Sequence, residues 1–110
     1  MIDIHDEQEF ERVIEDDCIS VMMFSANWCP DCIFIKPFIP SIEEKYKNLK
    51  FYLLNRDECM DIAIQYDVLG IPSFVCFKKG KEISRFVSTL RKTKEEIEAY
   101  LDKTIESGAK

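Results

Sequence analysis

The chain has 110 residues and a formal net charge of −6, and 46% of its residues are hydrophobic. This length suits a single domain with its own core. The acidic balance argues against nucleic acid or an anionic membrane as a partner, because both are bound by Lys/Arg patches. The first residues lack the basic and apolar regions of a secretory signal, and no stretch of about 18 apolar residues predicts a membrane span. We therefore expect a cytoplasmic protein.

The first half of the chain begins with a short strand expected at 2–4. A helix follows, and it begins where Asp6 and Glu9 have the spacing of a capping box. The nearly continuous apolar run at 19–24 is typical of a strand that is buried on both faces. These elements predict an alternation of strands and helices from the start of the chain.

A helical apolar pattern extends from about Ile33 to Tyr46. Proline removes a backbone hydrogen bond and bends a helix, so we expect a kink near Pro37. Residues 51–54 read as a second central strand, and a further helix is expected at about 59–66.

The second half ends in a hairpin and a helix. Strands at 73–77 and 82–87 are separated by a short turn, which predicts an antiparallel pair. Thr93 and Glu96 form a capping box for the last helix. We expect one domain over residues 1–106, with 107–110 as a frayed tail. A crossover followed by a hairpin predicts an α/β fold, in which helices cover both faces of a mixed sheet.

The pattern with the clearest chemistry is Trp28-Cys29-Pro30-Asp31-Cys32. The cysteines lie where a strand leads into a helix, and a helix N-terminus stabilises a thiolate on the first of them. The second lies one turn later, within disulfide reach. This spacing favours thiol–disulfide exchange, in which Cys29 attacks and Cys32 resolves the mixed disulfide. A buried pair without chemistry is the weaker interpretation, because Trp28 and Pro30 suit a surface turn.

A metal site is the competing interpretation of the two cysteines. Structural zinc usually takes four ligands from two short clusters, whereas this chain has one such cluster, and its single histidine, His5, is distant in sequence. A metal or Fe–S centre shared by Cys29 and Cys32 across a dimer stays open as an alternative. Of the other cysteines, Cys18 and Cys76 are expected to be buried small hydrophobes, and Cys59 is a candidate exposed regulatory thiol.

Gly70-Ile71-Pro72 interrupts the pattern before the hairpin. Pro72 cannot donate a hydrogen bond to a sheet, and the residues alone leave the isomer of the Ile71–Pro72 bond open, with trans the commoner state.

These motifs together resemble the thioredoxin family over nearly the whole chain. The matching segments are Trp28-Cys29-Pro30-Asp31-Cys32, Pro37, Leu54-Asn55 with Asp57, Tyr66 to Ser73, and Phe77-Lys78-Lys79-Gly80. The resemblance implies a thioredoxin fold: a central mixed sheet of four or five strands flanked by helices on both faces. It also implies that Pro72 is cis and packs beside Cys29.

The resemblance further implies reduction of protein disulfides through a dithiol–disulfide cycle of Cys29 and Cys32. Disulfide-containing proteins would be the substrates, and an NADPH-dependent flavoprotein reductase would supply electrons to a monomer. Neither cofactor nor metal is expected in the domain itself. The residues expected to contact substrate are Trp28, Pro30, Ile71, Pro72, Val87 and Ser88.

Four departures from the family pattern bear on the mechanism. Pro30-Asp31 stands where the family usually has Gly-Pro, and Ser88 stands where it has glycine. Met23 and Leu53 occupy the positions of a buried Asp and its Lys partner. Losing both charges together is energetically sensible, since a lone buried charge is costly. The usual proton relay to the second cysteine is then missing, so a non-catalytic interaction module is the further hypothesis.

Asp31 adds a negative charge between the two cysteines, and like charge disfavours a thiolate. We expect Asp31 to be a solvated residue of the helix. The alternative is that its carboxylate replaces the missing proton acceptor for Cys32.

Overall fold

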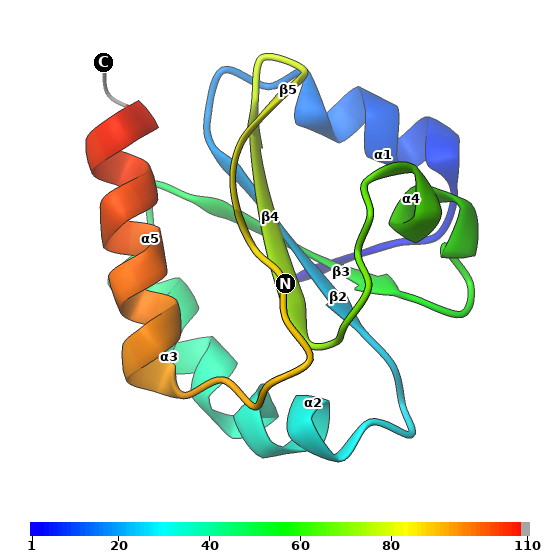
Figure 1. Ribbon diagram of the computed structural model, residues 1–110. Helices are drawn as coiled ribbons and strands as arrows, with labels where there is room; N and C mark the ends of the chain where they lie inside the picture. Colours follow the sequence, from blue (N-terminus) through cyan, green and yellow to red (C-terminus); the bar gives the residue numbers. More distant parts are fainter. Residues whose placement is uncertain (109–110) are drawn as a thin grey trace.

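A twisted five-stranded sheet separates two layers of helices in the computed structural model, which describes residues 1–108 (Figure 1). The strands are β1 (Ile2–Ile4), β2 (Ser20–Ser25), β3 (Lys50–Asn55), β4 (Ser73–Lys78) and β5 (Lys81–Phe86), in the spatial order β1-β3-β2-β4-β5. β3 pairs in parallel with both β1 and β2, whereas β4 is antiparallel to β2 and to β5. The sheet is mixed, as the sequence predicts.

Helices cover both faces of this sheet. α1 (Glu7–Ile14) and α4 (Met60–Gln65) lie on one face. The other face is covered by α2 (Pro30–Ile35), the 3₁₀ helix η1 (Lys36–Phe38), α3 (Ile39–Lys45) and α5 (Lys94–Gly108) (Figure 1). Within the described range 1–108, no helix combines the length and the apolar character that a membrane crossing requires.

The apolar run of β2 supplies both cores. Met22 and Phe24 belong to the core beneath α1 and α4, whereas Val21 and Met23 belong to the core beneath α3 and α5. Successive side chains of a strand point to opposite faces, so a strand covered on both sides is apolar at nearly every position. This accounts for the continuous run from which the strand is predicted.

The expected local signals are present in the structure. Asp6 caps α1 and accepts a hydrogen bond from the Glu9 amide at 2.8 Å. Thr93 and Glu96 cap α5 reciprocally, with hydrogen bonds of 3.2 Å and 3.0 Å. The long second helix is interrupted by η1, which contains Pro37. At the predicted kink the chain therefore changes from α-helix to a 3₁₀ helix for three residues.

Two of the expectations for the remaining cysteines are wrong, and one is confirmed. Cys18 is exposed, because it follows α1 in a turn where its amide donates to the Asp16 carboxylate. Cys59 is buried, and its thiol donates to the carbonyl of Ile4 in β1. Cys76 is buried, as expected.

The end of the chain continues α5. The helix extends to Gly108, two residues into the segment expected to fray. Residues 109–110 of that segment lie outside the described residues.

Candidate functional site

Cys29 caps the helix that carries the second cysteine. Its sulfur accepts a hydrogen bond from the Cys32 amide at 3.2 Å. Its thiol lies 3.7 Å from the carbonyl oxygen of Ile71, to which it donates. The Ile71–Pro72 peptide bond is cis, as the family resemblance implies. The structure therefore brings together the two motifs that are 40 residues apart in sequence, with both cysteines as free thiols.

The thiol of Cys32 has a pKa well above its ordinary value. Burial raises the pKa of Cys32 to about 11, and the hydrogen bond and charge of Cys29 act in the same direction. A hydrogen bond with the Ser25 hydroxyl opposes this shift of the pKa. A thiol of this pKa stays protonated near neutral pH.

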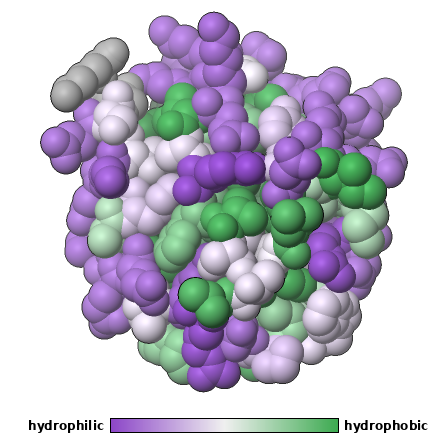
Figure 2. Space-filling model, in the orientation of Figure 1, coloured by the Kyte–Doolittle hydropathy of each residue, from purple (hydrophilic) through white to green (hydrophobic). Residues whose placement is uncertain are grey.

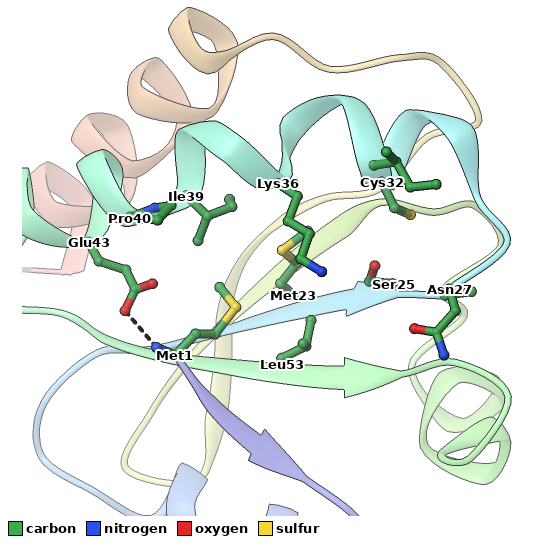
Figure 3. A pocket seen from close by; sticks show the side chains of 12 residues that line it. Met1, Met23, Ser25, Asn27, Cys32, Lys36, Ile39, Pro40, Glu43 and Leu53 are labelled. Atoms are coloured by element: carbon green, nitrogen blue, oxygen red, sulfur yellow. Dashed lines mark hydrogen bonds and ion pairs between the residues drawn. The ribbon is translucent and has the colours of Figure 1, made fainter.

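A cavity of about 320 Å³ lies beside Cys32, on the side where the family has its buried ion pair (Figure 3). Met23 and Leu53 line it from neighbouring strands, and they are directly paired in the register of β2 and β3. The Cys32 sulfur and the Ser25 hydroxyl face each other at one end of this cavity, and the Lys36 amine extends into it (Figure 3). In place of the family's ion pair, Cys32 therefore has two apolar side chains and the Ser25 hydroxyl on this side, with the Lys36 amine farther along the cavity.

Trp28 forms one side of the surface next to Cys29. The indole is 58% exposed, and its Nε1–H donates to the Asp57 carboxylate at 2.9 Å. The Arg56 guanidinium lies 5.2 Å from the centre of the ring. Two charged residues from the loop after β3 therefore fix the orientation of an exposed aromatic side chain, which becomes a rigid apolar contact.

Two loops complete this surface on the other side of Cys29. A Cβ placed on Gly70 would lie 2.3 Å from the carbonyl oxygen of Ser88, so the loops before β4 and after β5 touch. Ile71 and Pro72 are largely buried beneath this contact, and Val87 is half-buried. Pro30 lies exposed at the first position of α2. Of the six expected docking residues, Trp28 and Pro30 flank Cys29 in the chain, Ile71 contacts its thiol, and Ser88 touches the loop that carries Ile71 and Pro72.

Two exposed leucines in these loops are not among the residues expected from the sequence. Leu69 is 81% exposed and Leu90 is 73% exposed. Hydrophobic side chains gather across the middle of the face over which the loop after β5 runs, with hydrophilic residues around much of its edge (Figure 2). The sequence could have indicated both leucines, since each is a large apolar residue in a segment expected to be a loop.

Asp31 has a partner that the sequence does not indicate. Its carboxylate accepts a hydrogen bond from Arg91 Nε at 2.8 Å, and the Arg91 guanidinium lies 4.4 Å from the centre of the Phe34 ring. The next residue, Lys92, is buried, and its ammonium donates to the Ser88 carbonyl, the Ser88 hydroxyl and the Leu90 carbonyl. Asp31 is thus ion-paired, where the sequence predicts a solvated residue.

No group of three or more His, Cys, Asp or Glu residues that could hold a metal ion occurs in the part of the chain that the structure describes.

Several known proteins are similar to this chain over most of its length. The thioredoxin family model matches residues 1–103. The chain is 41% identical to sheep (Ovis aries) thioredoxin over 85 residues, which cover 77% of this chain and 78% of the relative. It is 38% identical to human (Homo sapiens) thioredoxin over 89 residues, covering 81% and 82% of the two chains. The chain belongs to the thioredoxin family.

Solved thioredoxins have the same fold. The Trypanosoma brucei brucei thioredoxin superposes with a TM-score of 0.87 at 22% identity, covering 96% of this chain and 91% of that one. A Nicotiana alata thioredoxin superposes with a TM-score of 0.81 at 28% identity, covering 94% and 90%. This confirms the predicted thioredoxin fold.

As a thioredoxin-family protein, the chain is a thiol–disulfide oxidoreductase that reduces protein disulfides. The non-catalytic module and the shared metal centre are not favoured by these relatives.

Proposed function

We propose that Cys29 is the nucleophile of this thioredoxin and Cys32 the resolving thiol. The Cys29 thiolate attacks one sulfur of a substrate disulfide, the substrate S–S bond breaks, and the departing sulfur takes a proton. Cys32 then loses its proton and attacks the Cys29 sulfur. This releases the second substrate thiol and leaves a Cys29–Cys32 disulfide, so two electrons pass to the substrate.

The observation that carries this assignment is the contrast between the two thiols. The Cys29 sulfur accepts the Cys32 amide hydrogen bond, which stabilises a thiolate. Burial raises the pKa of Cys32 to about 11. Once Cys29 is bound to substrate, its sulfur carries no charge. One of the causes that raise the pKa of Cys32 is then removed. The neighbouring Ser25 hydroxyl then supports the forming thiolate, in a site where Met23 has replaced the family's carboxylate.

The proposed docking surface consists of Trp28, Pro30, Ile71, Pro72, Val87 and Ser88. Its support is the convergence of Trp28 and the two touching loops around Cys29. An extended, largely apolar segment of a disulfide-containing protein suits it, because the exposed part of this surface is aromatic and aliphatic.

We place this activity in the cytoplasm, where thiols are kept reduced, and all five cysteines of the chain are free thiols. An NADPH-dependent flavoprotein reductase is the proposed electron donor that returns the Cys29–Cys32 disulfide to two thiols. One chain carries both cysteines of the cycle, so a monomer suffices for this electron transport.

Trapping of mixed disulfides tests the two roles. The Cys32→Ser variant should accumulate covalent complexes with disulfide-containing proteins such as insulin, because the nucleophile remains and the resolving thiol is absent. Cys29→Ser should form none and should not reduce insulin. Cys76→Ser serves as the control for loss of a buried thiol and should reduce insulin normally. Equal trapping by the Cys32→Ser and Cys29→Ser variants would contradict the assignment.

A further inference from the structure

A charged pair links the helix of the two cysteines to the loop after β5. Asp31 lies in the first turn of α2, between the cysteines, and Arg91 follows it by 60 residues in the chain. The Arg91 Nε donates to Asp31 Oδ1 at 2.8 Å, and its guanidinium stacks 4.4 Å from the centre of the Phe34 ring. Asp31 and Phe34 are three residues apart and therefore lie on the same side of α2. Arg91 is thus held by one helix face at two points.

The charge of Asp31 matters because of its place next to the nucleophile. A carboxylate close to a thiol opposes its ionisation by like-charge repulsion, and a nearby cation favours it. The charged and titratable groups around Cys29 are Cys32 and Asp31 on α2, Arg91 and Lys92 in the loop after β5, and Arg56 and Asp57 beside Trp28.

The other charged residues near Cys29 have hydrogen-bond or ion-pair partners other than Asp31. Lys92 donates only to the neutral oxygens of Ser88 and Leu90. Arg56 and Asp57 are bound to Trp28 and to each other. Among the ion pairs of the described residues, Arg91 is the cation in direct contact with Asp31, whereas Lys92 acts on Asp31 and Cys29 through its charge alone.

We propose that Arg91 is a positioning residue for the thiol–disulfide reaction: by pairing with Asp31 and stacking on Phe34, it cancels the carboxylate charge beside Cys29 and so maintains the Cys29 thiolate. The same contacts fasten the loop that carries Ser88 to the helix that carries the nucleophile. This inference rests on the proposed role of Cys29.

The rate at which iodoacetamide alkylates Cys29 in the reduced full-length chain at pH 7 measures the thiolate directly. Arg91→Gln should slow this alkylation about threefold, since an unbalanced charge at this range changes ionisation by roughly that factor. Asp31→Asn should accelerate it to a similar extent. Arg91→Lys should stay near the unsubstituted rate, because the charge is kept.

The double variant separates charge balance from a merely structural effect. The double variant Asp31→Asn, Arg91→Gln should alkylate near the unsubstituted rate, since both charges are then gone and their opposite effects on the thiolate cancel. The effect of Arg91→Gln alone should also shrink in about 1 M salt, where screening extends over only about 3 Å. Lys45→Gln, which removes a comparable ion pair with Glu98 far from the cysteines, should alkylate at the unsubstituted rate.

Two outcomes would overturn the proposal. One is an unchanged Cys29 alkylation rate in Arg91→Gln, and the other is a double variant that alkylates as slowly as Arg91→Gln alone. Either result leaves the trapping by Cys32→Ser untouched. Conversely, a failure of that trapping would remove Cys29 as the nucleophile whatever Arg91 does, so the two failures are distinguishable.

Discussion

At the scale of single residues, the contrast between the two thiols is what supports the proposed order of the reaction. Cys29 lies between the Cys32 amide and the Ile71 carbonyl, at the edge of an exposed apolar surface. Cys32 lines a cavity next to Met23 and Leu53 and has a pKa raised to about 11 by burial and by Cys29. In the proposed order, the first thiol meets the incoming substrate, and the second becomes reactive only after the first has reacted.

Selective alkylation should reveal this order. In the reduced protein at pH 8, iodoacetamide should label the exposed Cys18 and the nucleophile Cys29 well before Cys32, since the thiolate of Cys32 is scarce below its raised pKa. Labelling of Cys32 should rise with pH and reach about half its maximal rate near pH 11. Peptide mass spectrometry resolves the three sites, and denaturant should equalise them. Labelling of Cys32 as fast as Cys29 at pH 8 would refute this account.

The buried ion pair that the family has at the positions of Met23 and Leu53 can be introduced one residue at a time. Met23 is 3% exposed and lies opposite Leu53 in the strand register. Met23→Asp alone should lower the free energy of unfolding by about 3 kcal/mol, because it buries an unpaired carboxylate. Adding Leu53→Lys should recover part of this loss and accelerate the release of substrate from the mixed disulfide, since a base then stands near Cys32.

Urea unfolding and single-turnover kinetics of the mixed disulfide measure the two effects of this pair. Leu53→Lys alone is the matched control, and it should destabilise less than Met23→Asp because Leu53 is only half-buried. A double variant as unstable as the sum of the two single variants would show that no pair forms.

At the scale of elements, the site depends on close contact between two loops. Gly70→Ala should push the loop before β4 away from Ser88, because its Cβ would lie 2.3 Å from a backbone oxygen that cannot move freely. We expect a loss of about 1–3 kcal/mol in the free energy of unfolding, as for other overpacked positions. The KM for insulin reduction should also rise, since the docking surface is displaced.

Gly80→Ala provides the comparison for Gly70→Ala. Gly80 lies in the β4–β5 turn with φ of +82°, and its added Cβ meets a flexible Glu15 side chain. This variant should lose about 1 kcal/mol from backbone strain with an unchanged KM. Equal KM values for Gly70→Ala and Gly80→Ala would argue against a role of the loop contact in docking.

Elements were predictable from sequence where local patterns decide them. The capping residues Asp6 and Thr93 mark helix starts, and the run at 19–24 marks a strand buried on both faces, so the order of elements follows. The positions that only tertiary packing determines were not predictable. Cys59 is buried because β1 supplies an acceptor 55 residues earlier, and Asp31 is paired because the chain returns 60 residues later. Neither contact leaves a periodic signal in the sequence.

At the scale of the molecule, one sheet carries two separate cores. The core beneath α1 and α4 contains Ile62, and the core beneath α3 and α5 contains Leu101. Side chains of β2 enter both cores, so each core depends on a strand that the other also holds in place. The helix α2, which follows Cys29, begins five residues after that shared strand ends. The position of Cys29 therefore depends on the packing of both layers.

This shared strand predicts a single cooperative unfolding transition. Ile62→Ala and Leu101→Ala should each lower the free energy of unfolding by about 2–5 kcal/mol, since both side chains are at most 2% exposed and a cavity remains after truncation. The fluorescence of Trp28 and the far-ultraviolet circular dichroism should still change together in both variants. Leu69→Ala, which truncates a side chain 81% exposed, should leave the transition within about 0.5 kcal/mol. If Leu101→Ala unfolded the α5 side while Trp28 kept its native fluorescence, the two cores would be independent and the sheet would not couple them.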